Sequence, residues 1–137
     1  SQDVDSSILD RINYFSEFEA MDWEDEGPIV KDKFPALFKQ FPTAEKKAQV
    51  MTGAIRALFQ AGERGESEAV GHFSHRALCN WLEHAQDLTE FKSYKSCELL
   101  LDEAFHTFTD SLGDVDTRNC VHSLAIDNLG RPNNSIK

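Results

Sequence analysis

Four side chains that bind transition metals recur at helical spacing in the middle of the chain. They are Glu68, His72, His75 and Cys79. On a continuous helix over residues 66–86, successive side chains turn by about 100°, so these four would share a sector of about 60° opposite the apolar side. Carboxylate, imidazole and thiolate groups all bind zinc, so the spacing predicts a metal-binding or sensory helical domain as one hypothesis. A single helix rarely supplies four ligands to one ion. We therefore favour the simpler interpretation, a polar helix face, and keep metal binding as the alternative.

Two further patterns resemble metal sites but lack essential parts. Glu103 and His106 form an E-x-x-H pair, which di-iron helical bundles use twice, whereas this chain has one copy. Asp110, Asp114 and Asp116 lack the spacing, the central glycine and the final glutamate of a calcium-binding loop. A helix cap explains these aspartates sufficiently.

Signatures of nucleophilic catalysis and of phosphate binding are missing from the sequence. The chain contains no G-x-S-x-G, no family signature around any cysteine and no glycine-rich phosphate loop. Cys79 is expected to be the most accessible thiol, and His75 one turn earlier leaves a reactive-thiol role open. We accordingly predict no catalytic residues, no cofactor and no enzymatic activity. An enzyme that uses a histidine as acid or base is kept as a third hypothesis.

The charge of the chain is concentrated at one end. The formal net charge is -10, from 24 acidic and 14 basic residues in 137. Residues 1–26 contain nine acids and one base, whereas the remaining residues contain 15 acids and 13 bases. A negative field repels nucleic acid and anionic lipid and attracts basic proteins. The sequence therefore predicts a basic protein partner, with no direct nucleic-acid binding and no membrane binding.

The favoured site is the acidic segment that surrounds a tryptophan near the N-terminus. Its predicted partner-binding residues are Glu19, Asp22, Trp23, Glu24, Asp25 and Glu26. Charge around an aromatic anchor is a common design for protein interfaces, because charge steers the encounter and the aromatic ring supplies binding energy. This pattern favours a non-catalytic acidic binding module: an inhibitor, an immunity or antitoxin-type protein, or an adaptor that docks on a basic surface. The alternative is that Trp23 packs into the protein's own core.

Apolar spacing predicts an all-α fold, a single-domain bundle of five to six helices. The expected helices cover residues 6–20, two short segments within 29–41 that are divided at Pro35, and residues 44–61, 66–86, 96–112 and 116–128. Residues 44–86 are expected to form a central antiparallel helical hairpin. The segment 21–28 is expected to be a solvated turn because it ends in Gly-Pro. One domain would then span residues 1–130, followed by a loose tail over 131–137.

Composition adds expectations about location and assembly. No apolar run approaches the roughly 20 residues that cross a bilayer. Three cysteines without C-x-x-C spacing favour reduced thiols in the cytoplasm, and a secreted chain with one disulfide and one free cysteine is the alternative. Ten phenylalanines in 137 residues are generous for one core, which leaves a homodimer open.

Overall fold

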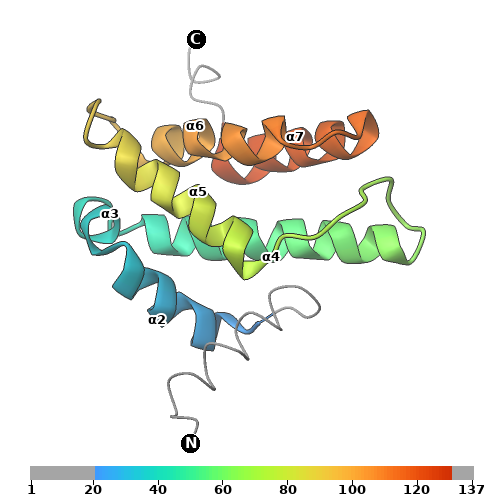
Figure 1. Cartoon of the computed structure of the whole chain (residues 1–137), viewed down its shortest axis with the longest axis horizontal. Helices are drawn as coiled ribbons and strands as arrows, with labels where there is room; N and C mark the ends of the chain where they lie inside the picture. Colours follow the sequence, from blue (N-terminus) through green and yellow to red (C-terminus); the bar gives the residue numbers. More distant parts are fainter. Residues whose placement is uncertain (1–20, 131–137) are drawn as a thin grey trace, which may run out of the picture.

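The computed structural model describes residues 21–130, and every regular element in that range is a helix (Figure 1). The six helices are α2 (Trp23–Lys33), α3 (Pro35–Gln40), α4 (Ala44–Glu63), α5 (His75–Leu88), α6 (Cys97–Asp110) and α7 (Val115–Leu129). The predicted all-α bundle is confirmed. The helix expected over 6–20 and the tail over 131–137 lie outside the described residues. Within 21–130, no helix combines the length and the apolarity that crossing a membrane requires.

The long helix α4 separates two groups of helices. In Figure 1, α6 and α7 lie on one side of α4 and α2 lies on the other. Helix α5 packs most extensively on α6, and α4 packs most extensively on α7. Residues 44–86 are predicted from the sequence to form an antiparallel hairpin of two helices packed along their length. In Figure 1, α5 instead runs obliquely to α4, so the two helices do not form such a hairpin. A connection without helical structure between Glu63 and His75 gives α5 the freedom to turn towards α6.

Helix α5 begins at His75, nine residues later than the apolar spacing predicts. Gly71 has a φ of +142°, a backbone conformation that side chains with a Cβ rarely adopt and that a helix excludes. Ser74 then caps the helix, since its Oγ accepts a hydrogen bond of 3.1 Å from the Ala77 amide. The predicted helix over 66–86 is therefore wrong over residues 66–74.

The connection before α5 folds back onto the end of α4. A Cβ placed on Gly62 would lie 1.8 Å from the carbonyl oxygen of Ala69, so this contact is open only to glycine. Ala69 and Phe73 are buried although neither lies in a helix. The connection thus belongs to the core and covers one end of α4.

The solvated turn expected over 21–28 is wrong, because α2 runs through Pro28. Proline in a helix deprives the carbonyl four residues earlier of its partner, and here that residue is the exposed Glu24, where water can replace the bond. Glu24 and Asp25 in the first turn also interact favourably with the helix dipole. The division at Pro35 is confirmed, since Pro35 opens α3.

An aromatic cluster forms the centre of the core. Phe73 packs edge-on against Trp81 and against Phe108, with ring centroids 6.3 and 5.1 Å apart. Trp81 also meets Phe105 edge-on at 5.1 Å. The indole Nε1 of Trp81 donates a 3.0 Å hydrogen bond to the carbonyl oxygen of Leu101, which satisfies its only polar atom in the core. These contacts join α5, α6 and the connection before α5.

The ends of the later helices follow their sequence signals closely. Ser96 caps α6 as predicted, through a 3.3 Å bond from the Leu99 amide to its Oγ. Asp114 caps α7, two residues before the expected Asp116. Gly130 ends α7 with a φ of +77°. Short polar side chains and glycine thus fix the register of the C-terminal half.

Candidate functional site

The four residues of the predicted metal site do not come together. Glu68 and His72 lie on the connection before α5 and are exposed, whereas His75 and Cys79 lie in the first two turns of α5. Across residues 21–130, no group of three or more His, Cys, Asp or Glu side chains could hold a metal ion. The metal hypothesis is wrong in its premise, because Gly71 and Ser74 prevent the continuous helix that it requires.

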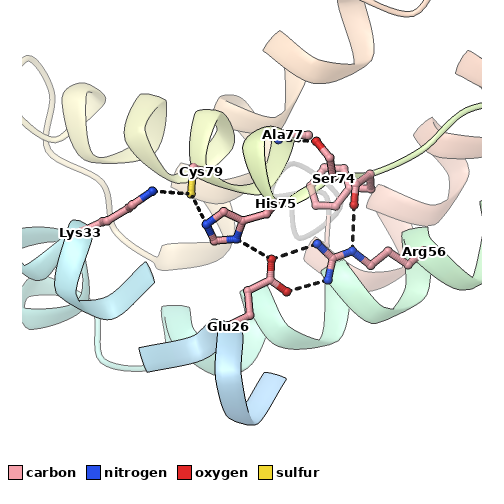
Figure 2. Close-up of polar contacts among 8 residues, drawn as sticks. Glu26, Lys33, Arg56, Ser74, His75, Ala77 and Cys79 are labelled. Carbon is pink, nitrogen blue, oxygen red and sulfur yellow. Dashed lines mark hydrogen bonds and ion pairs between the residues drawn. The ribbon is translucent and has the colours of Figure 1, made fainter. Parts of the chain in front are cut away.

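In place of a metal site, the structure holds a buried network of charged side chains from three helices (Figure 2). Arg56 of α4 donates two hydrogen bonds to the Glu26 carboxylate of α2, from Nη1 to Oε1 at 2.6 Å and from Nη2 to Oε2 at 3.0 Å. His75 of α5 contacts the same carboxylate, with its Nδ1 2.9 Å from Oε2. We call Glu26, Arg56 and His75 the buried charge network. A bidentate guanidinium–carboxylate contact requires a specific relative orientation of the two groups. It therefore constrains the arrangement of the three helices that carry these residues.

Burial makes this network sensitive to the loss of any member. The side chain of Glu26 is 0% exposed, that of His75 6% and that of Arg56 12%. The Nε–H of the same guanidinium donates a 2.8 Å hydrogen bond to the carbonyl oxygen of Phe73. Every charge in the network thus has a partner, as burial of charge requires.

The network changes the proton affinities of its members. Burial of Glu26 alone would raise its pKa, but the hydrogen bonds and charges of His75 and Arg56 outweigh burial and lower the pKa of this carboxyl. Burial of His75 would lower its pKa, but contacts with Cys79 and Glu26 prevail and raise the pKa to about 9. The imidazolium of His75 and the carboxylate of Glu26 are therefore the stable forms at neutral pH.

The network continues from His75 to a cysteine and a lysine. The Sγ of Cys79 lies 3.3 Å from the Nε2 of His75, one turn earlier on α5. The Nζ of Lys33, the last residue of α2, lies 3.6 Å from the same sulfur. Figure 2 shows the order Lys33, Cys79, His75, Glu26, Arg56 along one chain of contacts. A thiol, an imidazole and a carboxylate thus stand in contact one after another, with Lys33 and Arg56 at the two ends.

The acidic segment divides between the surface and the interior. Asp22, Glu24 and Asp25 are exposed around the first turn of α2, whereas Glu26 is fully buried in the charge network. The inclusion of Glu26 among surface contacts is therefore corrected: its carboxylate is directed inward. Glu19 lies outside the described residues. We call Asp22, Glu24 and Asp25 the α2 acidic cluster.

Trp23 occupies an intermediate position between core and surface. It is half-buried and packs against the hydrophobic core, and its ring lies over Gly27 so closely that a Cβ there would meet Nε1 at 2.6 Å. Its buried Nε1 has no hydrogen-bond partner in the described part of the chain. Both sequence interpretations of Trp23, as a core residue and as an interface residue, thus describe part of its surroundings.

A pocket of about 350 Å³ opens between the start of α2 and the middle of α4. Its lining residues are Met21, Trp23, Gln49, Thr52, Gly53, Arg56, Ala57 and Gln60. The hydroxyl of Thr52 is buried and has no hydrogen-bond partner within residues 21–130. A Cβ on Gly53 would meet nothing within 4 Å, so this glycine borders open space. We call this cavity the Trp23 pocket.

Sequence reasoning missed the roles of Arg56 and Lys33. Arg56 follows the buried Ile55 on an amphipathic helix, where a basic residue resembles ordinary solvated surface. One signal was present for Glu26: it precedes the buried Val30 by four residues, so a helix through Pro28 would place its carboxylate on the inward face. The assumption of a turn at Gly27-Pro28 concealed that signal.

The chain was compared with protein-family models, with curated proteins and with solved structures, and none of the three comparisons found a match. Functional inference therefore depends on the geometry of the site itself.

Proposed function

We propose that this protein is a non-catalytic binding module whose α2 acidic cluster and Trp23 pocket dock on a basic surface of a partner protein. The observation that carries the proposal is the adjacency of exposed carboxylates to a pocket with unsatisfied polar atoms. Asp22, Glu24 and Asp25 stand in the first turn of the helix whose Trp23 lines the pocket. Charge would steer the partner, and the pocket would receive one of its side chains.

The state of the α2 acidic cluster supports an external partner. None of its three carboxylates forms an ion pair with a residue of the described range, while Glu26 beside them is neutralised by Arg56. Nine of the 24 acidic residues lie within residues 1–26. Unpaired carboxylates in one area produce a local negative field, which raises the association rate of a basic protein.

The polar atoms at the Trp23 pocket also support a docking role. Buried polar groups are nearly always hydrogen-bonded, yet Trp23 Nε1 and Thr52 Oγ1 have no partner among residues 21–130. A partner side chain with an apolar stem would pack against Met21 and Ala57 in this pocket, next to the two residues that carry these atoms. The pocket therefore suits a single inserted side chain.

The broader biological role follows from this mode of binding. An inhibitor, an immunity or antitoxin-type protein, or an adaptor would each use an acidic surface to cover a basic one. Cys79, Cys97 and Cys120 are all free thiols, which agrees with action in the cytoplasm. The homodimer that the ten phenylalanines leave open is a separate possibility, and it would appear as a doubled mass in light scattering.

The test combines charge reversal with a matched control. The triple variant Asp22→Lys, Glu24→Lys, Asp25→Lys would be compared with Glu83→Lys, Asp87→Lys, Asp127→Lys, which changes the net charge equally at exposed positions elsewhere. Partners would be captured from host lysate at low and physiological salt, identified by mass spectrometry, purified and then measured by stopped-flow association. We expect the α2 variant to reduce the association rate constant by at least tenfold, and the control by less than threefold.

A second variant tests the pocket separately. Gly53→Leu would fill the Trp23 pocket without touching the α2 acidic cluster, since the space beside Gly53 is open. We expect a faster dissociation rate with an unchanged association rate. The docking proposal would be refuted by a partner whose affinity is the same for the two charge variants, or by one whose association rate constant is the same for both.

A further inference from the structure

We infer that Cys79 is a nucleophilic thiol, activated by His75 and Lys33, that forms mixed disulfides with small disulfide molecules. This inference is independent of the proposed docking function, because it concerns the opposite end of α2 and the first two turns of α5. It is carried by two side chains that contact one sulfur atom, His75 and Lys33, and by Glu26 and Arg56 behind His75 (Figure 2).

The geometry places two potential cations beside the sulfur. His75 Nε2 lies 3.3 Å from Cys79 Sγ, and Lys33 Nζ lies 3.6 Å from it on the other side. A thiolate, and not a thiol, is the nucleophile, and neighbouring His and Lys cations favour the thiolate. His75 lies on the same helix as Cys79, whereas Lys33 comes from α2. The environment of the sulfur therefore depends on the fold and not on the local sequence alone.

Glu26 holds the imidazole in the orientation that this chemistry needs. Its Oε2 accepts from Nδ1 of His75 at 2.9 Å, which directs Nε2 towards the sulfur. Arg56 in turn holds the Glu26 carboxylate with two hydrogen bonds. The charged groups that face Cys79 and His75 are therefore Lys33 and Glu26 from α2 and, through Glu26, Arg56 from α4. Glu26 and Arg56 act as positioning residues.

The other two cysteines lack this environment. Cys97 is buried, and burial raises the pKa of its thiol. Its sulfur lies 3.2 Å from the hydroxyl of Thr43 and 3.7 Å from a carboxylate oxygen of Glu98, with no cation in contact. Cys120 is half-buried like Cys79, and no hydrogen bond or ion pair to its sulfur joins it to another described residue. Cys120 is therefore a matched internal control for exposure.

The reaction is thiol–disulfide exchange. The thiol of Cys79 loses its proton to solvent, and the resulting thiolate, which lies beside the cations of His75 and Lys33, attacks one sulfur of a small disulfide such as oxidised glutathione. The new S–S bond forms as the old one breaks, and the second sulfur leaves with the electron pair and takes a proton from water. Cys79 ends as a mixed disulfide, and no other oxidant is consumed. Half-burial of the thiol favours small disulfides over protein disulfides.

The test measures the rate at which each cysteine is modified in the intact protein. Oxidised glutathione is added at pH values from 6 to 8.5, the reaction is quenched with acid, and each cysteine peptide is quantified by mass spectrometry. We expect Cys79 to react at least tenfold faster than Cys120 throughout this pH range, because only Cys79 has cations in contact with its sulfur.

Two variants separate activation from accessibility. Lys33→Met keeps the stem of an exposed side chain and removes its charge, so it should slow Cys79 severalfold and leave Cys120 unchanged. Glu26→Gln, in protein shown to remain folded by circular dichroism, should also slow Cys79 and leave Cys120 unchanged. Equal rates at Cys79 and Cys120 would overturn the inference, as would a rate at Cys79 that Lys33→Met does not alter.

Discussion

Glu26 and His75, 49 positions apart in the sequence, share a hydrogen bond of 2.9 Å inside the protein. The contact joins the middle of α2 to the first residue of α5, and Arg56 completes it from α4. Three helices are thus connected by one carboxylate that water cannot reach. Three predictions follow from this carboxylate, from its histidine and from the glycine next to it in the sequence.

Removal of the Glu26 charge should destabilise the protein strongly. In Glu26→Gln, Arg56 and His75 would remain buried as cations without a counter-charge. Breaking one side of a buried ion pair costs about 3–5 kcal/mol. The free energy of unfolding, measured by urea denaturation at pH 7, should fall by that amount.

A neighbouring glutamate provides the control for this prediction. Glu24 lies two residues earlier on α2 and is exposed. Glu24→Gln should change the free energy of unfolding by no more than about 0.5 kcal/mol. If both variants lost the same small amount, the buried charge network would contribute little to stability.

Stability should decrease as pH rises through the alkaline range. The pKa of His75 is about 9 in the folded protein against 6.5 for an unperturbed histidine. A group whose pKa is raised by folding stabilises the folded state fully below its unfolded pKa, and that contribution is lost as pH rises through the folded pKa. The shift corresponds to about 3 kcal/mol, lost between pH 6.5 and just above pH 9. Urea midpoints between pH 6 and 10 would measure it.

A histidine variant isolates the group responsible. His75→Gln, combined with Cys79→Ser to remove the neighbouring thiol, should lose most of the pH dependence of the urea midpoint, and the buried Cys97 thiol accounts for the residual slope. Cys79→Ser alone should remove part of the slope and keep the part that the contact with Glu26 contributes. A double variant with the full slope would assign the pH dependence to other groups.

Two helical glycines should respond in opposite directions to alanine. In Gly27→Ala the new Cβ would lie 2.6 Å from Trp23 Nε1, so the indole must move and about 1–3 kcal/mol of stability should be lost. In Gly53→Ala nothing lies within 4 Å, and the gain in helix propensity should stabilise the protein by up to about 1 kcal/mol. Urea denaturation measures both, and tryptophan emission should shift in the Gly27 variant alone.

Much of the fold could be predicted where apolar spacing and caps agree. The helices α4, α6 and α7 begin and end within a few residues of expectation, because Ser96 and Gly130 mark their ends and no glycine of positive φ interrupts them. The start of α5 could not be predicted in this way. Val70 and Phe73 continue its apolar spacing, but Val70 is 73% exposed and Phe73 reaches the core from an extended segment.

The candidate site was predictable only in part, for a different reason. Helical spacing of four residues correctly indicated that His75 and Cys79 could meet. The partners of His75 lie on other helices, and long-range pairing of this kind leaves no periodic trace in one sequence. Glu26 therefore resembled its exposed acidic neighbours, although burial gives it a different role.

The contact between Gly62 and the carbonyl of Ala69 determines where the chain can change in length. The connection from α4 to α5 lies against helix backbone there, so one inserted residue would displace Ala69 and Phe73 from the core. The segment between Leu88 and Cys97 has no such constraint along its exposed residues Phe91, Lys92 and Ser93. In related chains, insertions and deletions should accumulate after α5, and the spacing from Gly62 to Ser74 should remain fixed.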